Sequence, residues 1–172
     1  MNIKIIKADI TTLSVDAIVN AANSSLYGGG GVDGAIHRAA GPKLLEECGQ
    51  IRRTKYKNGL PTGQAVITKG YGLPAKYVIH TVGPVYDMDR NPERLLSNAF
   101  SNSLRVAEEN KLKTIAFPAI STGIFGYPKQ ECAEVGYKVI GKYPYKSIEE
   151  VTLCLFSDRD KTIFEKVFKK WN

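Results

Sequence analysis

The 172-residue chain has little of what builds metal centres and disulfide frameworks. It has three widely spaced cysteines (Cys48, Cys132 and Cys154) and two histidines far apart in sequence (His37 and His80). None of the usual zinc-ligand spacings occurs among them, so we expect neither a bound metal nor a cofactor. An odd number of scattered cysteines also fits a reducing compartment better than a disulfide framework.

No segment predicts a membrane span or a secretory leader. The longest apolar runs hold only a few residues, whereas a membrane helix needs roughly 20. Residues 1–7 lack the apolar stretch of a signal peptide. The sequence also has no internal repeat, no Walker loop ending in Gly-Lys-Ser/Thr and no Gly-x-Ser-x-Gly elbow. We therefore expect a cytoplasmic protein without a membrane partner, folded as one domain over residues 1–172.

The amino-acid composition is that of an ordinary globular protein. Hydrophobic residues make up 43% and charged residues 24%, which excludes a disordered or collagen-like chain. The net charge is +7, with the basic excess in residues 42–60 and 136–172. A basic excess can mark a nucleic-acid partner, but no aromatic residues interleave along a basic strand in the way that single-strand binders use. A solvated basic face is the better interpretation, so a nucleic-acid partner is not expected.

Strand-like and helix-like segments alternate, which predicts an α/β fold. Apolar and β-branched runs predict strands at residues 3–7, 17–20, 65–68, 77–82, 114–117 and 150–156. Periodicity and terminators predict helices at residues 32–40, 42–51, 92–110 and 128–141, and a final amphipathic helix capped by Asp158. This order indicates a sandwich with a mostly central, partly parallel sheet. Ligands of such sheets bind beyond the carboxyl ends of the strands.

A glycine-rich loop follows the strand at residues 17–20. It contains four consecutive glycines, residues 28–31, and runs into the helix that begins near Val32. Glycines are costly to order, and they suit a backbone that passes close to a ligand. Free amides at a helix N-terminus make an anion site, and phosphate is the usual anion. The loop has no lysine, so phosphate binding would depend on backbone amides; a flexible turn is the alternative.

A second such loop, residues 118–128, joins a buried strand to a helix. Its segment Ser121, Thr122, Gly123, Ile124, Phe125 and Gly126 brackets two apolar side chains with glycines. We expect amides turned toward a ligand here, with Ile124 and Phe125 offering surface to a sugar or a base. An ordinary turn with two packing side chains is the alternative. Two such loops could face each other across a diphosphate.

Polar side chains near strand ends are candidates for binding. Asp9 follows the first strand, where it can cap a turn or accept a hydrogen bond from the amino group of adenine. Asn20 and Asn23 end the second strand, and their amides can hold a loop backbone or a ribose hydroxyl.

Four further residues carry chemistry that the sequence alone leaves open. Asp33 lies in the first turn of a helix, where a carboxylate favours the dipole, yet it adjoins the expected phosphates. His37 lies one turn later on the same face, either as a surface residue or as part of the site. His80 alternates within a strand and is expected to be structural. Cys48 is expected to be partly buried and inert.

Together these motifs resemble the macrodomain family, specifically its MacroD-type branch of ADP-ribose hydrolases and O-acetyl-ADP-ribose deacetylases. The resemblance covers nearly the whole chain. Its motifs are Ala8–Thr11, Val15–Ser24 with Gly28–His37, Pro61–Gly63, His80–Pro84 and Pro118–Pro128. The chain departs from the family at Ala8, where glycine is usual, and it lacks the Cys/His ligand set of the zinc-dependent branch. The resemblance therefore implies a three-layer α/β/α sandwich with a mixed, mostly parallel central sheet and a metal-free mechanism.

The resemblance also implies roles for individual residues. Asp9 would receive the adenine amino group with Ile10 beside it, and Phe156 would stack on the adenine. Phe125 would lie next to the distal ribose. The diphosphate and the rest of the substrate would contact Gly30, Gly31, Val32, His37, Ser121, Thr122, Gly123, Ile124 and Gly126. Asn23 and Asp33 would carry catalysis, with Asn20 supporting the loop.

The activity implied is hydrolysis of an acyl ester on the distal ribose of ADP-ribose. The substrate would be O-acetyl-ADP-ribose, or a protein that is mono-ADP-ribosylated on an Asp or Glu side chain. The chain would be a monomer. Asp33 would orient and deprotonate the water while Asn23 holds a ribose hydroxyl. The sequence leaves open whether a substrate phosphate activates the water, and whether attack falls on the carbonyl or the anomeric carbon. A reader module without turnover and an ADP-ribose 1″-phosphate phosphatase are the alternatives.

Overall fold

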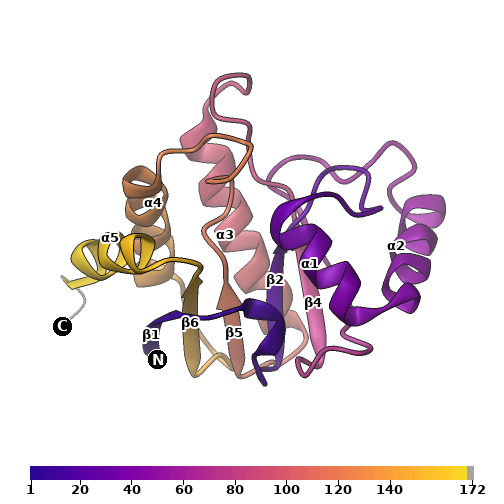
Figure 1. Ribbon diagram of the computed structural model, residues 1–172, viewed down its shortest axis with the longest axis horizontal. Coiled ribbons are helices and arrows are strands. Elements are labelled where there is room, and N and C mark those ends of the chain that lie inside the picture. Colours follow the sequence, from indigo (N-terminus) through magenta and orange to yellow (C-terminus); the bar gives the residue numbers. More distant parts are fainter. Residues whose placement is uncertain (170–172) are drawn as a thin grey trace.

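The computed structural model describes residues 1–169 and shows strands and helices in alternation (Figure 1). The strands are β1 (Asn2–Lys7), β2 (Ala17–Ala21), β3 (Ala65–Lys69), β4 (Tyr77–Thr81), β5 (Thr114–Phe117) and β6 (Glu150–Leu155). The helices are α1 (Gly31–Ala40), α2 (Pro42–Thr54), α3 (Pro92–Glu109), α4 (Lys129–Lys142) and α5 (Asp158–Phe168), with a short 3-10 turn at Ile10–Thr12. Within this described part, no helix is long and apolar enough to cross a bilayer.

The strands form one sheet in the order β1-β6-β5-β2-β4-β3. All neighbouring strands run parallel except β3, which pairs antiparallel with β4 at one edge. This confirms the expected mixed, mostly parallel sheet. Strand β2 lies between β5 and β4. Strand β4 pairs with the whole length of β2, whereas β5 pairs with Ala17 and Ile18 at its amino end.

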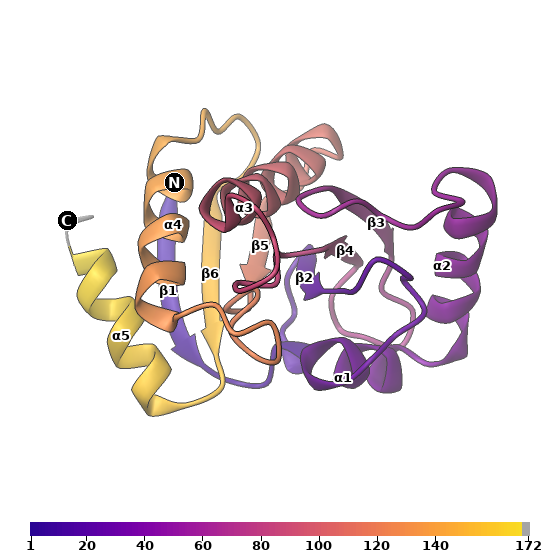
Figure 2. The same ribbon diagram turned by 90° about the horizontal axis from the view of Figure 1, so that it is seen from above.

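Helices cover both faces of the sheet, which confirms the three-layer sandwich. On one face, α3, α4 and α5 pack with sheet residues such as Val19. On the other, α1 and α2 cover Ile18 and Val78; Figure 2 shows α3 and α1 on opposite sides of β2 and β4. Because successive side chains of a strand point to opposite faces, Asn20 and His80 point into the α1–α2 layer.

The segments that carry the sequence motifs follow strands at one edge of the sheet. Parallel strands β1, β2, β4, β5 and β6 all end there. The register pairs Lys7 with Leu155, so Asp9 and Phe156 follow neighbouring strands. The loops after β2 and β5 lie on the same side (Figure 1). Strand direction therefore brings together residues that are more than 140 positions apart in the chain.

The start of α5 differs from the prediction. The cap is Ser157, whose extended backbone precedes the helix and whose Oγ accepts the amide proton of Asp160 at 3.1 Å. Asp158 is instead the first helical residue, where its charge favours the helix dipole. Asp160 also pairs with Lys129 Nζ at 2.8 Å, which ties α5 to α4.

Gly83, just after β4, allows the loop after β5 to approach the sheet. A Cβ atom at this position would lie 2.0 Å from Ser121 Oγ and 2.7 Å from Ile120 Cγ2. The Ser121 hydroxyl can rotate away, but Ile120 is completely buried and its methyl group has little room to move. The close contact between the two post-strand segments therefore requires glycine at position 83.

We predict that Gly83→Ala lowers the free energy of unfolding by about 1–3 kcal/mol, the usual cost of overpacking. Denaturant titration measures this change. Gly123→Ala is the matched control, since a Cβ atom there meets nothing within 4 Å. Equal stability of the two variants would show that the contact at position 83 does not constrain the loop.

Candidate functional site

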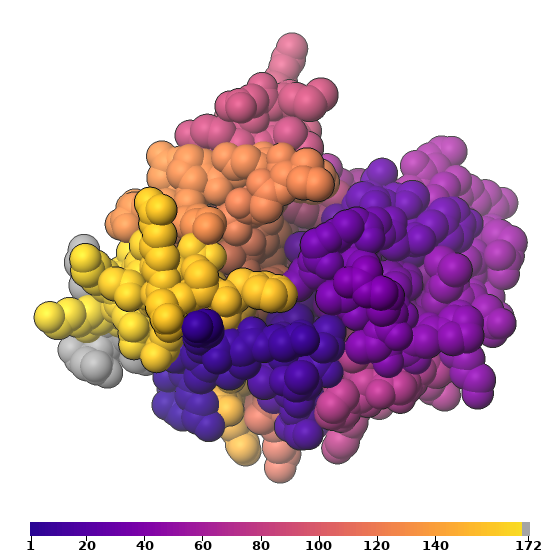
Figure 3. Space-filling model, viewed as in Figure 1, coloured from indigo at the N-terminus to yellow at the C-terminus, as the bar shows by residue number. Residues whose placement is uncertain are grey.

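The glycine-rich loop and the first turn of α1 present a row of backbone amides without internal acceptors. Helix α1 begins at Gly31 after Gly30, which makes no side-chain cap. Within residues 1–169, the N–H groups of residues 28–33 donate no intramolecular hydrogen bond. Figure 3 shows a hollow between this purple surface and the orange surface that precedes α4. The free amides and the positive end of the helix dipole together favour an anion in this hollow.

The loop after β5 offers a second set of free amides. Its ends are closed by the bond from the Tyr127 amide to Ser121 O at 2.9 Å, and Ser121 takes a left-handed backbone with φ of 67°. In the described chain, the N–H groups of Gly123, Ile124 and Phe125 donate to no protein acceptor. The Ile124 side chain is 95% exposed, so this loop has both the amides and the apolar surface that the sequence predicted.

Asp33 is the buried charge of the site. It is only 4% exposed, and its Oδ1 accepts a hydrogen bond from Asn20 Nδ2 at 2.8 Å. His37 Nε2 lies 3.4 Å from the same oxygen, one helical turn away as predicted. The other oxygen, Oδ2, is buried and has no hydrogen-bond partner among residues 1–169. Burial raises the pKa of Asp33, while the Asn20 bond and the nearby His37 oppose the rise.

The unpartnered Oδ2 faces the glycine-rich loop. A Cβ atom on Gly29 would lie 3.3 Å from this oxygen and 3.1 Å from Asn23 Nδ2. A Cβ atom on Gly34 would lie 2.5 Å from the carbonyl oxygen of Gly29. The two glycines therefore allow the glycine-rich loop to pack closely against α1 beside Asp33.

A line of buried polar groups continues from Asp33 into the protein. Asn20 Nδ2 lies 3.1 Å from His80 Nδ1, and Thr68 Oγ1 lies 2.9 Å from His80 Nε2. Burial lowers the pKa of His80 to about 3. Cys48 Sγ lies 4.0 Å from His80 Nε2. Cys48 is completely rather than partly buried, which corrects the sequence prediction, and burial raises its thiol pKa to about 12.

Asn23 holds the glycine-rich loop in place. Its Nδ2 donates to Gly28 O at 3.0 Å, and its Oδ1 accepts from the amide and the hydroxyl of Ser25. The loop-holding alternative is thereby confirmed, and contact with a ribose hydroxyl stays a prediction. Arg52 adds a second anchor through its bond to Ser25 O at 2.7 Å, and its guanidinium lies 5.1 Å from the centre of the Tyr27 ring.

At the opposite end of the edge lie Asp9, Ile10 and Phe156. Asp9 caps the short 3-10 turn, since its Oδ1 accepts from the amide and the hydroxyl of Thr11 at 3.0 and 2.7 Å. The capping role is therefore confirmed, and recognition of adenine stays a prediction. Ile10 is buried, whereas Phe156 is 68% exposed at the end of β6. An exposed phenyl ring at this edge is available for stacking on a base.

Some residues of the site carried no signal of their own in the sequence. Thr68 and Cys48 reach His80 only through the pairing of β3 with β4 and the packing of α2. The sequence predicted that Arg52 belongs to a solvated basic face. Gly34 and Gly83 were visible within the motifs, and glycines beside functional loops are the signal that could have identified them. Among the described residues, no three His, Cys, Asp or Glu side chains gather as metal ligands.

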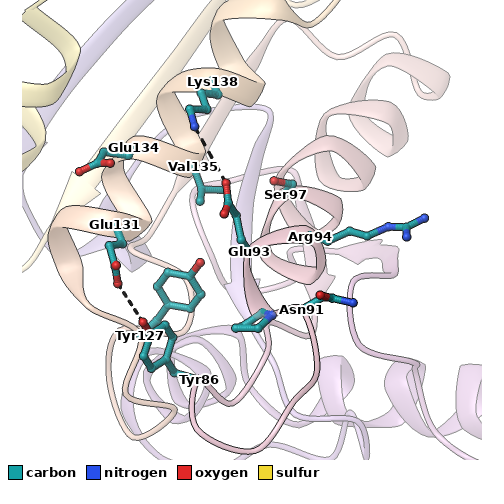
Figure 4. Close-up of a pocket in the computed structure, with 11 residues that line it drawn as sticks. Tyr86, Asn91, Glu93, Arg94, Ser97, Tyr127, Glu131, Glu134, Val135 and Lys138 are labelled. Atoms are coloured by element: carbon teal, nitrogen blue, oxygen red, sulfur yellow. Dashed lines mark hydrogen bonds and ion pairs between the residues drawn. The ribbon is translucent and has the colours of Figure 1, made fainter.

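A separate cavity of about 800 Å³ lies between α3 and α4 (Figure 4). Glu93 pairs there with Lys138 at 3.9 Å, and Tyr86 donates its hydroxyl proton to Glu131 at 3.2 Å. Tyr86 also donates its amide proton to Phe125 O at 2.9 Å. The wall of this cavity therefore braces the loop after β5 from behind, and the free amides of that loop lie outside it.

Comparisons with known proteins agree with this architecture. The family model described as "Macro domain" matches residues 19–136. An Escherichia fergusonii protein named O-acetyl-ADP-ribose deacetylase is 48% identical over 168 residues, covering 96% of this chain and 94% of its own. A Xenopus laevis protein named ADP-ribose glycohydrolase MACROD2 is 50% identical over 165 residues, covering 93% of this chain and 38% of its own.

The same holds for solved structures. The Oceanobacillus iheyensis macrodomain with ADP superposes with a TM-score of 0.93 at 44% sequence identity, covering 97% of this chain and 90% of that one. The sequence match and the superposition both extend over nearly the whole chain, and they include the two loops and the buried carboxylate. The chain therefore belongs to the macrodomain family.

Proposed function

We propose that this site binds ADP-ribose and hydrolyses an acyl ester on its distal ribose. The observation that carries the proposal is the buried Asp33 carboxylate next to the glycine-rich loop. Among residues 1–169, its Oδ2 has no hydrogen-bond partner, and amides of this loop and of the loop after β5 have no protein acceptor. The names of relatives at 48–50% identity, an O-acetyl-ADP-ribose deacetylase and an ADP-ribose glycohydrolase, support the same reaction class.

The diphosphate fits between the two loops because both offer backbone N–H groups rather than side-chain charges. The amides of residues 28–33 and 123–125 are free to donate, and the N-terminus of α1 adds its partial positive charge. The adenine would then lie toward Asp9 and Phe156, with its ring on the exposed phenyl group. The distal ribose would lie near Phe125 and Asp33, at the other end of the hollow.

Asp33 has the features of a general base. Its Oδ1 is held by Asn20, so the unpartnered Oδ2 would accept a proton from a water molecule as that water attacks the acyl carbonyl. The ester bond then breaks, and the leaving ribose oxygen takes this proton to become a hydroxyl while the acyl group leaves as a carboxylate. A carboxyl whose pKa is raised by burial binds that proton better than an exposed one. The loop amides hold the diphosphate meanwhile, so the reacting ester stays next to the base.

We predict that Asp33→Ala removes most hydrolysis and keeps ADP-ribose affinity within about tenfold, or ~1.4 kcal/mol. The measurements are acetate release from O-acetyl-ADP-ribose and calorimetric titration with ADP-ribose. Glu149→Ala is the control, because Glu149 is exposed and precedes β6, at the opposite edge of the sheet from the two loops. Turnover close to the parent rate in Asp33→Ala would assign water activation to a substrate phosphate instead.

The raised pKa of Asp33 predicts the direction of two pH effects. Hydrolysis declines as the pH falls through this pKa, which lies above the ordinary value of about 4. The folded state binds this proton more tightly than the unfolded state, so the ionised group lowers stability at neutral pH and this cost disappears on acidification. Asp33→Asn should therefore melt at or above the parent temperature at neutral pH, with an advantage that shrinks in acid. An advantage that grows as the pH falls would contradict this assignment.

We predict that Phe156→Ala weakens ADP-ribose binding by about tenfold, because base–aromatic stacking is worth roughly 1–3 kcal/mol. Met88→Ala is the control, since Met88 is 83% exposed and lies outside the proposed site. Calorimetry with ADP-ribose and with ribose 5-phosphate separates a loss of adenine stacking from a general loss of binding. If Phe156 stacks on adenine, only the nucleotide loses affinity.

Two alternatives make different products. A reader module binds ADP-ribose and releases nothing, and a phosphatase releases phosphate from ADP-ribose 1″-phosphate. Incubation with O-acetyl-ADP-ribose, a glutamate-linked mono-ADP-ribosylated protein and ADP-ribose 1″-phosphate, side by side, distinguishes all three. For the protein substrate, hydrolysis in ¹⁸O-water places the label in the glutamate after attack on the carbonyl, and in the ribose after attack on the anomeric carbon.

A further inference from the structure

The amide group of Asn20 is held in an orientation that leaves one of its own atoms unsatisfied. Its Nδ2 donates to Asp33 Oδ1 at 2.8 Å and lies 3.1 Å from His80 Nδ1. Its Oδ1 is buried and has no hydrogen-bond partner within residues 1–169. A buried carbonyl without a partner costs about 1–3 kcal/mol. The two contacts of Nδ2, rather than full satisfaction of the amide, therefore determine how Asn20 is turned.

These contacts permit one arrangement of protons on His80. Because Asn20 Nδ2 is a donor, His80 Nδ1 accepts, and the neutral ring carries its proton on Nε2. That proton points to Thr68 Oγ1 at 2.9 Å. The other groups that face the ring are the Cys48 thiol from α2, 4.0 Å from Nε2, and the His37 ring from α1, 6.4 Å away between centroids. Neither of them displaces Asn20 from Nδ1.

We propose that His80 is a positioning residue for the reaction at Asp33: its Nδ1, with the ring proton on Nε2 toward Thr68, accepts a hydrogen bond from Asn20 Nδ2 and so keeps that amide turned toward the carboxylate. In the reversed orientation, Asn20 Oδ1 would face two acceptors, Asp33 Oδ1 and His80 Nδ1, and would repel the ionised carboxylate. His80 thus keeps Asp33 ionised and its Oδ2 free for the substrate. The inference depends on the proposed function, because it assigns His80 a part in that reaction.

The test compares two substitutions of His80. His80→Leu removes the acceptor, whereas His80→Asn returns an acceptor at the position of Nδ1. We expect His80→Leu to lower kcat for O-acetyl-ADP-ribose by about tenfold or more and to keep ADP-ribose affinity within about threefold. Its acidic limb of kcat moves to higher pH, because Asp33 loses a donor that stabilises its charge. His80→Asn regains most of the lost turnover.

Thr68→Val provides an independent test that leaves the histidine in place. It removes the acceptor for Nε2–H with little change in volume, so we expect the same two effects in smaller size. Ser103→Ala is the control: it deletes a buried bond to Ala99 O of 2.7 Å on the opposite side of the sheet. It should lower stability without moving the pH profile of kcat.

The proposal would be overturned if His80→Leu and Thr68→Val both had the same kcat and the same pH profile as the parent protein. Equal losses in His80→Leu and His80→Asn would also overturn it, since they indicate packing alone. Nitrogen NMR of His80 and carboxyl NMR of Asp33 need no turnover. A proton on Nδ1 at neutral pH, or an Asp33 titration unchanged in His80→Leu, would refute the role of His80. An inactive parent with the expected spectra would instead defeat only the proposed function.

Discussion

The hydrogen bond from Asn20 to the buried carboxylate of Asp33 joins the central strand of the sheet to the helix that carries the proposed base. A carboxylate placed in the interior without such a donor takes up a proton, because the protein replaces water poorly around a charge. The donor must also stay in place while the ligand arrives. Strand β2 supplies that rigidity, since β4 pairs with it along its whole length, Asn20 included, and β5 pairs with Ala17 and Ile18.

The loops after β2 and β5 share a related feature, which is a set of backbone amides without a protein acceptor among residues 1–169. Backbone amides have fixed directions only when the loop itself is fixed. Asn23 and Arg52 anchor the glycine-rich loop, and Tyr86 anchors the loop after β5. Burial keeps the pKa of Asp33 raised, and the Asn20 bond and the nearby His37 only partly offset this effect.

Much of this could be read from the sequence, because the deciding patterns are local. The alternation of apolar runs predicted every strand, and the spacing of Asp33 and His37 placed both on one face of α1. The loops were visible through their glycines. The features that the sequence did not predict depend on contacts between distant segments or on a single backbone angle. The cap of α5 is Ser157 because its extended backbone aims the hydroxyl at the helix.

The line from Asp33 to Thr68 could not be predicted for the same reason. It crosses β2, β4 and β3, and strand register decides which polar side chains meet. His80 looked structural because an alternating strand pattern says only that a side chain is buried, not what it touches. The structure shows that the antiparallel edge strand β3 places Thr68 next to His80.

The two faces of the sheet should tolerate different kinds of amino-acid substitution during evolution. The layer beneath α3, α4 and α5 is filled by apolar side chains, and such a layer accepts exchanges that conserve volume. The layer beneath α1 and α2 contains a line of polar side chains joined by hydrogen bonds, so a single replacement there removes a partner from a buried neighbour. Substitutions should therefore accumulate unevenly across the sheet, freely on one side and in matched pairs on the other.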